Sequence, residues 1–404
     1  MAARNTLHIR GGEIPELFAQ SGAGVPTASL TPGFRHSEVM IQDGRIAAVE
    51  PSLDGAPVPV LDARECLVLP GFIDVHVHGA VGYDTMDASQ TGLSEMAEFY
   101  AQHGVTGFLP TTMTAPHSDT LAAVISVAQC DPLPLCGARI LGVHLEGPYI
   151  SPAFPGAQKS ENIREPSIAE FATLAEAGPV RMITLAPEQP GAHELIREAR
   201  RRGVVAVAGH TNASYDELEA AVQIGILQAT HTYNAMSGLH HRRPGTLGAV
   251  LSDDRIYAQL IADNIHVHPA AMRILNRCKS VARTVLITDA IRATGMEPGY
   301  YDLGGQSVTV ADGACRLNDG TLAGSVLTLE IGLANFAAAA GLSLGESWPA
   351  AGRSPAASLG LGEEFGSIEP GYWGDLTVLD HELGVVATVV AGNVVYLRDE
   401  ARLT

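Results

Sequence analysis

Two histidines, His76 and His78, stand two residues apart in the stretch DVHVHG. The segment around them is short and apolar, which predicts a buried strand. Side chains two apart on a strand point to the same face. Neutral imidazole is the commonest metal-binding side chain, so the pair could supply two ligands to one cation. Two buried structural histidines would show the same spacing, so the pair alone leaves both interpretations open.

Other polar side chains stand at or near the ends of further short apolar runs. They are Thr111, Thr112, Glu146, Glu188, His210, His231, Asp263 and Asp289. If the runs are parallel strands of one barrel, these ends meet at one mouth. Gathering several imidazoles and carboxylates there is unfavourable without a cation. Such ligands, without thiolates, suit one or two ions of Zn²⁺, Fe²⁺, Mn²⁺ or Co²⁺, and positions left for water make the site catalytic.

Three more histidines receive a different interpretation. His144 shares the face of Glu146 but lies two residues deeper, so we expect it below the metal ligands. His103 and His117 lie outside the run ends and are expected to be structural or solvated. The run over 180–188 ends without a lysine, which leaves Glu146, not a carbamylated lysine, as the natural carboxylate between two ions.

Eight apolar runs must position these side chains. They cover residues 71–79, 104–112, 138–147, 180–188, 203–211, 226–234, 256–263 and 283–290, and helical stretches separate most of them. This alternation predicts an α/β fold with a (β/α)8 TIM-like barrel, with a doubly wound sheet as the alternative. Residues 290–325 are expected to form an excursion after the eighth strand.

Both ends of the chain have a different pattern of short strands and turns. Asp43-Gly44 is typical of a tight β-hairpin. We therefore expect a small β-sandwich domain built from residues 1–68 and 355–404, beside a catalytic barrel over 69–354.

The composition limits the class of partner. Among 404 residues, 44 acidic and 25 basic side chains give a net charge of −19, which argues against nucleic acid and anionic membranes. Five cysteines form no CxxC pair, so we expect reduced thiols in a cytoplasmic protein. The N-terminus has no apolar signal segment, and the longest apolar stretch is too short for a membrane span. An anionic substrate needs a local basic patch, and the densest is LHHRRPG at 239–245.

Several longer motifs point to one family. They are LPGFIDVHVHG, GVTGFLPTTMT, HLEGPYISP, GHTNA, HTYNAMSGLHHRRPG, IADNIHVH, ITDAIRATGM and GTLAGSVLTL. From about residue 40 to its end, the chain resembles the amidohydrolase superfamily, and within it the family of N-acetylglucosamine-6-phosphate deacetylases. The resemblance implies hydrolysis of the acetamide of a phosphorylated N-acetyl amino sugar, in amino-sugar catabolism or cell-wall recycling.

The resemblance also implies roles for individual residues. Glu146, His210 and His231 match the family's metal ligands, and Asp289 matches its catalytic acid/base. The pair His76 and His78 matches ligands that build a second metal position in some members.

Substrate binding is implied in the same way. Arg242 and His266 would bind the phosphate, in a homodimer that shares the phosphate site across its interface. Asn234, Ala235 and Met236 would line the sugar pocket through backbone groups. Where some members have a histidine that contacts the substrate carbonyl, this chain has Gln158, which can donate a hydrogen bond but carries no charge.

Other functions remain open at this point. A related amidohydrolase could act on N-acetylgalactosamine 6-phosphate or on an N-acyl amino acid, and a non-catalytic metal-binding scaffold could share the fold. The presence of Asp289 argues against the scaffold, because a structural metal site does not need an acid/base.

Overall fold

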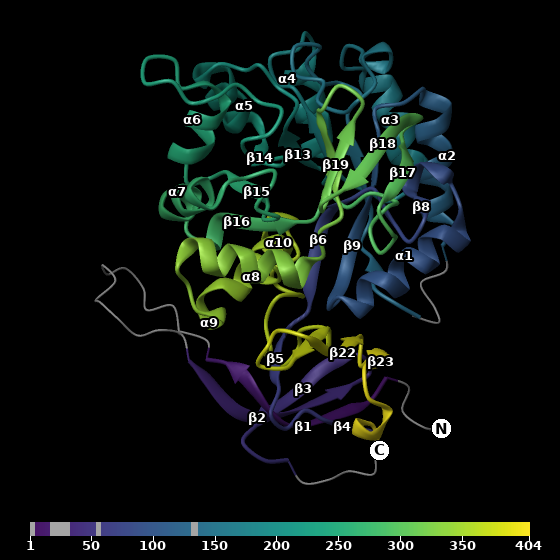
Figure 1. Ribbon diagram of the computed structural model, residues 1–404, viewed down its shortest axis with the longest axis vertical. Helices are drawn as coiled ribbons and strands as arrows, with labels where there is room; N and C mark the ends of the chain where they lie inside the picture. Colours follow the sequence, from purple (N-terminus) through teal and green to yellow (C-terminus); the bar gives the residue numbers. More distant parts are fainter. Residues whose placement is uncertain (1–4, 17–32, 54–57, 131–135) are drawn as a thin grey trace.

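The computed structural model describes residues 5–16, 33–53, 58–130 and 136–404. Its larger part is a nearly closed parallel barrel with helices between its strands (Figure 1). Each of the eight predicted runs contributes a strand, which confirms the (β/α)8 barrel. The strands are β6 (Phe72–Val77), β9 (Val105–Thr112), β11 (Val143–Glu146) with the short β10 (Arg139–Ile140) before it, β12 (Val180–Leu185), β13 (Val205–Ala208), β14 (Ile226–Ala229), β15 (Tyr257–Ile261) and β16 (Thr284–Ile287).

The barrel strands carry apolar residues on both faces because both faces are covered. Every residue of β6 and of β9 is buried, as is usual in parallel sheets. β6 pairs with β9 on one side. On the other side the Asp289 N–H donates to the His76 carbonyl at 3.0 Å, and the His78 N–H donates to the Ala290 carbonyl at 2.8 Å. The barrel therefore closes at the residues that the sequence predicts as metal ligands and as the acid/base.

The helices surround this barrel. They are α1 (Gln90–Gln102), α2 (His117–Ala128), α3 (Ile168–Ala177), α4 (Ala192–Arg201), α5 (Tyr215–Ile224), α6 (Gly245–Ser252), α7 (Pro269–Lys279), α8 (Leu329–Ala340), α9 (Leu344–Ser347) and α10 (Arg353–Ser358). Short 3-10 turns are η1 (Thr85–Asp87), η2 (Ser160–Asn162), η3 (Val281–Arg283), η4 (Trp348–Ala350) and η5 (Glu400–Arg402). Ser214 and Glu217 form a capping box that starts α5 a few residues after His210. No helix in the described ranges is long and apolar enough to cross a membrane.

The lower end of the barrel is closed by apolar packing. Ile73, Val207 and Ile287 from three strands form one core cluster with Ala356 of α10 and with Phe365. This packing excludes water from that end, so the open end is the one where the strands finish.

The chain termini form a separate sheet below the barrel (Figure 1). Its strands are β1 (Leu7–Pro15), β2 (Phe34–Gln42), β3 (Arg45–Glu50), β4 (Val60–Asp62), β5 (Leu67–Pro70), β21 (Leu376–Leu379), β22 (Val385–Val390) and β23 (Asn393–Leu397). β21 pairs with β5, which joins the two ends of the chain. The Asp43-Gly44 turn connects β2 to β3 with φ values of 51° and 79°, so the predicted hairpin is confirmed.

The excursion after β16 is itself a four-stranded antiparallel sheet. Its strands are β17 (Gly299–Leu303), β18 (Gln306–Ala311), β19 (Ala314–Leu317) and β20 (Leu322–Ser325). Two further short strands, β7 (Gly79–Ala80) and β8 (Tyr83–Asp84), form a hairpin after β6. The β17–β20 sheet lies at the barrel end opposite the terminal sheet (Figure 1), where it can form a wall of the site.

Candidate active site

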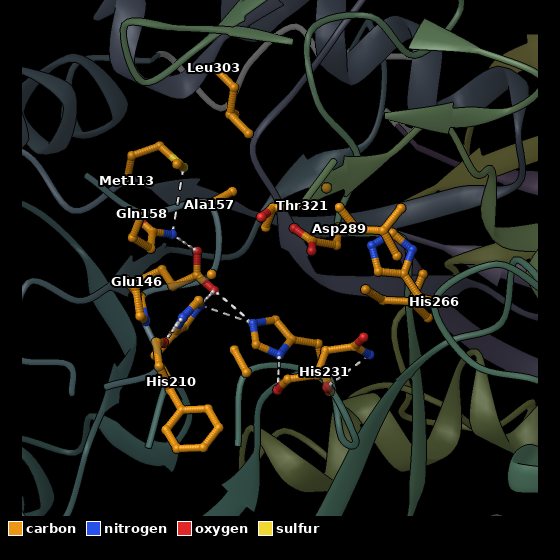
Figure 2. A pocket seen from close by; sticks show the side chains of 18 of the residues that line it. Met113, Glu146, Ala157, Gln158, His210, His231, His266, Asp289, Leu303 and Thr321 are labelled. Carbon is orange, nitrogen blue, oxygen red and sulfur yellow. Dashed lines mark hydrogen bonds and ion pairs between the residues drawn. The ribbon is translucent and has the colours of Figure 1, made fainter. Parts of the chain in front are cut away.

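Six predicted side chains converge at the open end of the barrel. All six are buried: His76, His78, Glu146, His210, His231 and Asp289. The first two lie on or next to β6, the third ends β11, and the others follow β13, β14 and β16 by two residues. Figure 2 shows dashed lines from the Glu146 carboxylate to Gln158, His210 and His231.

The backbone bends sharply at three of these residues. His210, His231 and Asp289 have positive φ values of 47°, 28° and 52°. A left-handed conformation costs a non-glycine residue about 1–2 kcal/mol. The residue before His210 is Gly209, where a Cβ would lie 2.6 Å from Thr184 and 2.7 Å from Thr230. Only glycine therefore fits at position 209, where the strand end packs against these two threonines.

Glu146, His210 and His231 form the first compact group. The Glu146 Oε1 atom lies 3.3 Å from the Nε2 atom of each histidine, and the two Nε2 atoms are 3.1 Å apart. Together these three residues could hold a metal ion.

The hydrogen bonds behind these histidines provide a test of whether a cation fits. His210 Nδ1 lies 3.0 Å from the Phe154 carbonyl, and His231 Nδ1 lies 3.2 Å from the Asn234 carbonyl. A carbonyl accepts only, so each Nδ1 carries the proton. In the neutral rings both Nε2 lone pairs then face each other and the Glu146 carboxylate. These two Nε2 atoms and the carboxylate oxygen are three acceptors with no donor between them, and a metal ion fits there.

His76, His78 and Glu146 form a second group of potential ligands. His78 Nε2 lies 3.2 Å from Glu146 Oε2 and 3.2 Å from Asp289 Oδ1, and its Nδ1 lies 3.2 Å from the Thr111 carbonyl. His76 Nε2 lies 3.4 Å from Glu146 and 3.3 Å from Asp289. Because the two groups share Glu146, the geometry accommodates one ion or two.

The carboxylates at the centre are ionised despite their burial. Burial alone would raise the pKa of Glu146, but the charge of the neighbouring His76 holds that pKa well below its usual range. For Asp289, burial again raises the pKa, and His76 and His78 more than offset it, so the pKa is lowered. A carboxylate is a proton acceptor, as a general base requires.

His144 lies in the barrel interior, where its two ring nitrogens contact hydroxyl groups. Nδ1 is 3.2 Å from Thr111 Oγ1, and Nε2 is 2.8 Å from Thr184 Oγ1. Burial, reinforced by the neighbouring His76, lowers the pKa of His144 well below its usual value. The two hydroxyl contacts and the lowered pKa suit a neutral ring that supports the barrel interior.

Gln158 reaches the site but uses its amide on the protein. Its Nε2 donates to Glu146 Oε2 at 2.5 Å and contacts Met113 Sδ at 3.8 Å, and its Oε1 accepts from the Thr114 N–H at 2.7 Å. Both N–H groups are engaged, so in this arrangement Gln158 orients Glu146. The predicted contact with a substrate carbonyl would require the amide to leave these partners.

A cavity of about 540 Å³ opens above the group. Asn234, Ala235, His266 and Gln158 line it, together with His78, Glu146, His210, His231 and Asp289. The Met236 side chain is buried in the hydrophobic core. Arg242 is exposed and is not among the residues that line this cavity, with its Nη1 2.9 Å from His241.

Two predicted strand-end acids have structural partners. Glu188 accepts from Thr211 Oγ1 at 2.5 Å and from the Asn212 N–H at 2.7 Å, which holds the loop after His210. Asp263 lies 2.7 Å from His266 Nδ1 and orients that ring beside the cavity. Neither residue belongs to the two possible metal groups.

Sequence reasoning missed one wall of the cavity. Leu303 at the end of β17, Thr321 in the turn before β20 and Met113 after β9 line it (Figure 2). Arg316 on β19 lines it too. The motif GTLAGS, which includes Thr321, is the signal in the sequence that could have indicated this wall.

Comparisons with known proteins agree with this geometry. The model of the Amidohydrolase family matches residues 67–395. The chain is 36% identical over 374 residues to N-acetylglucosamine-6-phosphate deacetylase from Bacillus subtilis (strain 168), covering 91% of this chain and 94% of the relative. It is 40% identical over 357 residues to N-acetylgalactosamine-6-phosphate deacetylase from Escherichia coli O157:H7, covering 88% and 93%.

Solved structures show the same similarity. One is an N-acetyl-D-glucosamine-6-phosphate deacetylase mutant from Mycobacterium smegmatis in complex with N-acetyl-D-glucosamine-6-phosphate. It has a TM-score of 0.86 and 32% identity, covering 97% of this chain and 99% of that one. The N-acetylglucosamine-6-phosphate deacetylase from Thermotoga maritima has a TM-score of 0.85 and 34% identity, covering 96% and 99%.

Proposed function

The chain belongs to the amidohydrolase family, and we propose that it hydrolyses the acetamide of N-acetyl-D-glucosamine 6-phosphate to D-glucosamine 6-phosphate and acetate, in amino-sugar catabolism. The observation that carries this proposal is the buried Glu146 between two histidine pairs, with Asp289 beside it, at the floor of a 540 Å³ cavity. Relatives that act on such sugars match nearly the whole chain.

The residues fit a divalent metal of the Zn²⁺, Fe²⁺, Mn²⁺ or Co²⁺ class. Glu146, His210 and His231 would hold one ion, and His76, His78 and Glu146 would hold a second. When bound, such a metal polarises a carbonyl and makes water a stronger acid. Gln158 and the carbonyls of Phe154 and Asn234 orient three of these side chains.

Asp289 moves the proton in this proposal. Its carboxylate accepts a proton from the water that attacks the acetamide carbonyl. It then donates that proton to the sugar nitrogen, because an amine leaves far more readily when protonated. The hydrogen bond from the Asp289 N–H to the His76 carbonyl fixes the backbone at this point, so the carboxylate is held beside the reacting atoms.

The phosphate would be bound by His266 and by Arg242 from the partner subunit of a homodimer. Arg242 is exposed and lies outside the cavity of its own chain, which suits a side chain that binds the substrate of the neighbouring subunit.

A cytoplasmic location is also part of the proposal, since the five cysteines show no paired spacing.

The Arg242→Ala substitution tests the phosphate assignment. We expect mainly a higher KM for the phosphorylated sugar and a loss of about ten- to a hundredfold in kcat/KM, because a charge-assisted contact is removed. The unphosphorylated sugar should be a poor substrate and nearly indifferent to the change. Arg243→Ala, at the exposed neighbouring position, is the matched control. Equal losses on both sugars would mean that Arg242 has a structural role.

A second candidate substrate is N-acetylgalactosamine 6-phosphate, because a relative named for that sugar is 40% identical. Acetate release from both sugar phosphates, and from N-acetyl amino acids, separates the candidates. The proposal predicts the highest kcat/KM on the glucosamine derivative. A clear preference for the galactosamine epimer or for an N-acyl amino acid would replace the substrate while leaving the metal chemistry in place.

A further inference from the structure

The wall that the β17–β20 sheet contributes to the cavity carries a cation without an assigned function. Arg316 on β19 lines the cavity together with Gly320 and Thr321 of the following turn. It is the one arginine or lysine among the residues that line this cavity in the described part of the chain. None of the ion pairs found among the described residues involves Arg316. Its charge is therefore available to a ligand.

The hydrogen bonding of Arg316 keeps its guanidinium partly available. Nη1 donates to the Gly320 carbonyl at 2.9 Å, which ties the side chain to its own hairpin. A guanidinium has five N–H donors in a planar fork. One is used here, and the others can pair with the oxygens of an anion. Because the contact to Gly320 restrains the side chain, less conformational freedom is lost when an anion binds.

The strand register sets how far Arg316 is from the reacting centre. The Ser325 N–H donates to the Asp289 carbonyl at 2.8 Å, so the end of β20 lies beside the catalytic position. Arg316 pairs with Leu322, three residues earlier on β20. At about 3.3 Å per residue, this register places Arg316 opposite a point about 10 Å along the strand from Ser325.

This separation matches the chemistry of the substrate. The acetamide stands on C2 of the pyranose and the phosphate on C6, which extends from C5, across the ring from C2. With the acetamide at Asp289, the phosphate must lie away from the metal group. His266 also lines the cavity, but Asp263 lies 2.7 Å from its Nδ1 and offsets positive charge there. In a chain of net charge −19, a further cation beside His266 and the partner's Arg242 favours the binding of a dianion.

We propose that Arg316 binds the 6-phosphate within the same subunit and so helps to select phosphorylated over free sugars. This inference rests on the proposed function and adds a residue to it. Every subunit would then hold one phosphate-binding cation of its own, with Arg242 added by the partner subunit.

Steady-state kinetics on N-acetylglucosamine with and without the 6-phosphate test this inference. Arg316→Ala should raise KM for the phosphorylated sugar, with about a ten- to hundredfold loss in kcat/KM, and should change the free sugar little. Arg316→Lys should recover part of the loss, because it restores the charge without the fork. Asn318→Ala, at an exposed position of the same hairpin outside the cavity, is the matched control and should behave as the parent.

Three outcomes overturn the inference in distinguishable ways. No acetate release from the phosphorylated sugar by the parent would overturn the proposed function as well. A parent that prefers the phosphorylated sugar, with Arg316→Ala unchanged or equally impaired on both sugars, would overturn the phosphate assignment alone. Finally, mixed dimers of Arg316→Ala and Asp289→Asn subunits should release acetate no faster than the two variants assayed separately. Faster release would mean that Arg316 binds the phosphate in the partner's site.

Discussion

Replacing Asp289 by Asn should reduce turnover of the phosphorylated sugar by about 10²–10⁴-fold while KM changes little. Asparagine keeps the size of the side chain but its amide cannot accept and return a proton. The Asp289 carboxylate lies 3.2 Å from His78 and 3.3 Å from His76, so the metal content must be measured on the same sample. The expected result is a folded protein with bound metal and lost turnover.

The matched control for this substitution is Asp312→Asn. Asp312 lies on the surface of the β17–β20 sheet and, like Asp289, has a φ of 52°, so the same chemical change is made in a similar backbone. Its activity should equal that of the parent. If Asp289→Asn retains a rate within a few-fold of the parent, Asp289 does not transfer the proton.

Removal of the metal should abolish activity, and the addition of a divalent cation should restore it. Glu146→Gln should lose metal and activity together, at least as severely as Asp289→Asn, because Glu146 belongs to both possible metal groups. Without its charge, the lone pairs of His210 and His231 face a neutral amide. Metal analysis by mass spectrometry and acetate release on the same samples make the measurement.

The number of ions follows from a second variant. His76 belongs to one of the two groups only, so His76→Ala should lose one of two ions and keep the other. For the Glu146→Gln variant, the matched control is Glu219→Gln at an exposed position on α5, which removes a glutamate charge away from the site and should keep metal and activity. A single ion in the parent that His76→Ala leaves in place would reject the two-ion arrangement, and full activity in metal-free protein would reject the metal chemistry altogether.

The barrel and the positions of its ligands were predictable because they depend on local pattern. Eight buried runs ended at polar residues, and strand ends meet at one face of a barrel whatever the details of the loops. The same holds for the Asp43-Gly44 hairpin, where residue type determines the turn.

The orientation of loop side chains could not be predicted in this way. After His231 the chain has φ values of 85° at Tyr233 and 47° at Ala235, so no regular alternation indicates that Met236 turns into the core. The amide of Gln158 meets Glu146 twelve residues away in sequence through a loop without helix or strand periodicity. Arg316 lines the cavity only because β19 pairs with β20 in one register, which depends on contacts far apart in the chain.

The most direct test of the account is product analysis after incubation of the metal-loaded protein with N-acetylglucosamine 6-phosphate. The account predicts acetate and glucosamine 6-phosphate in equal amounts, with neither formed after chelation. Intact substrate after prolonged incubation with metal-loaded, folded protein, or release of inorganic phosphate in place of acetate, would contradict it.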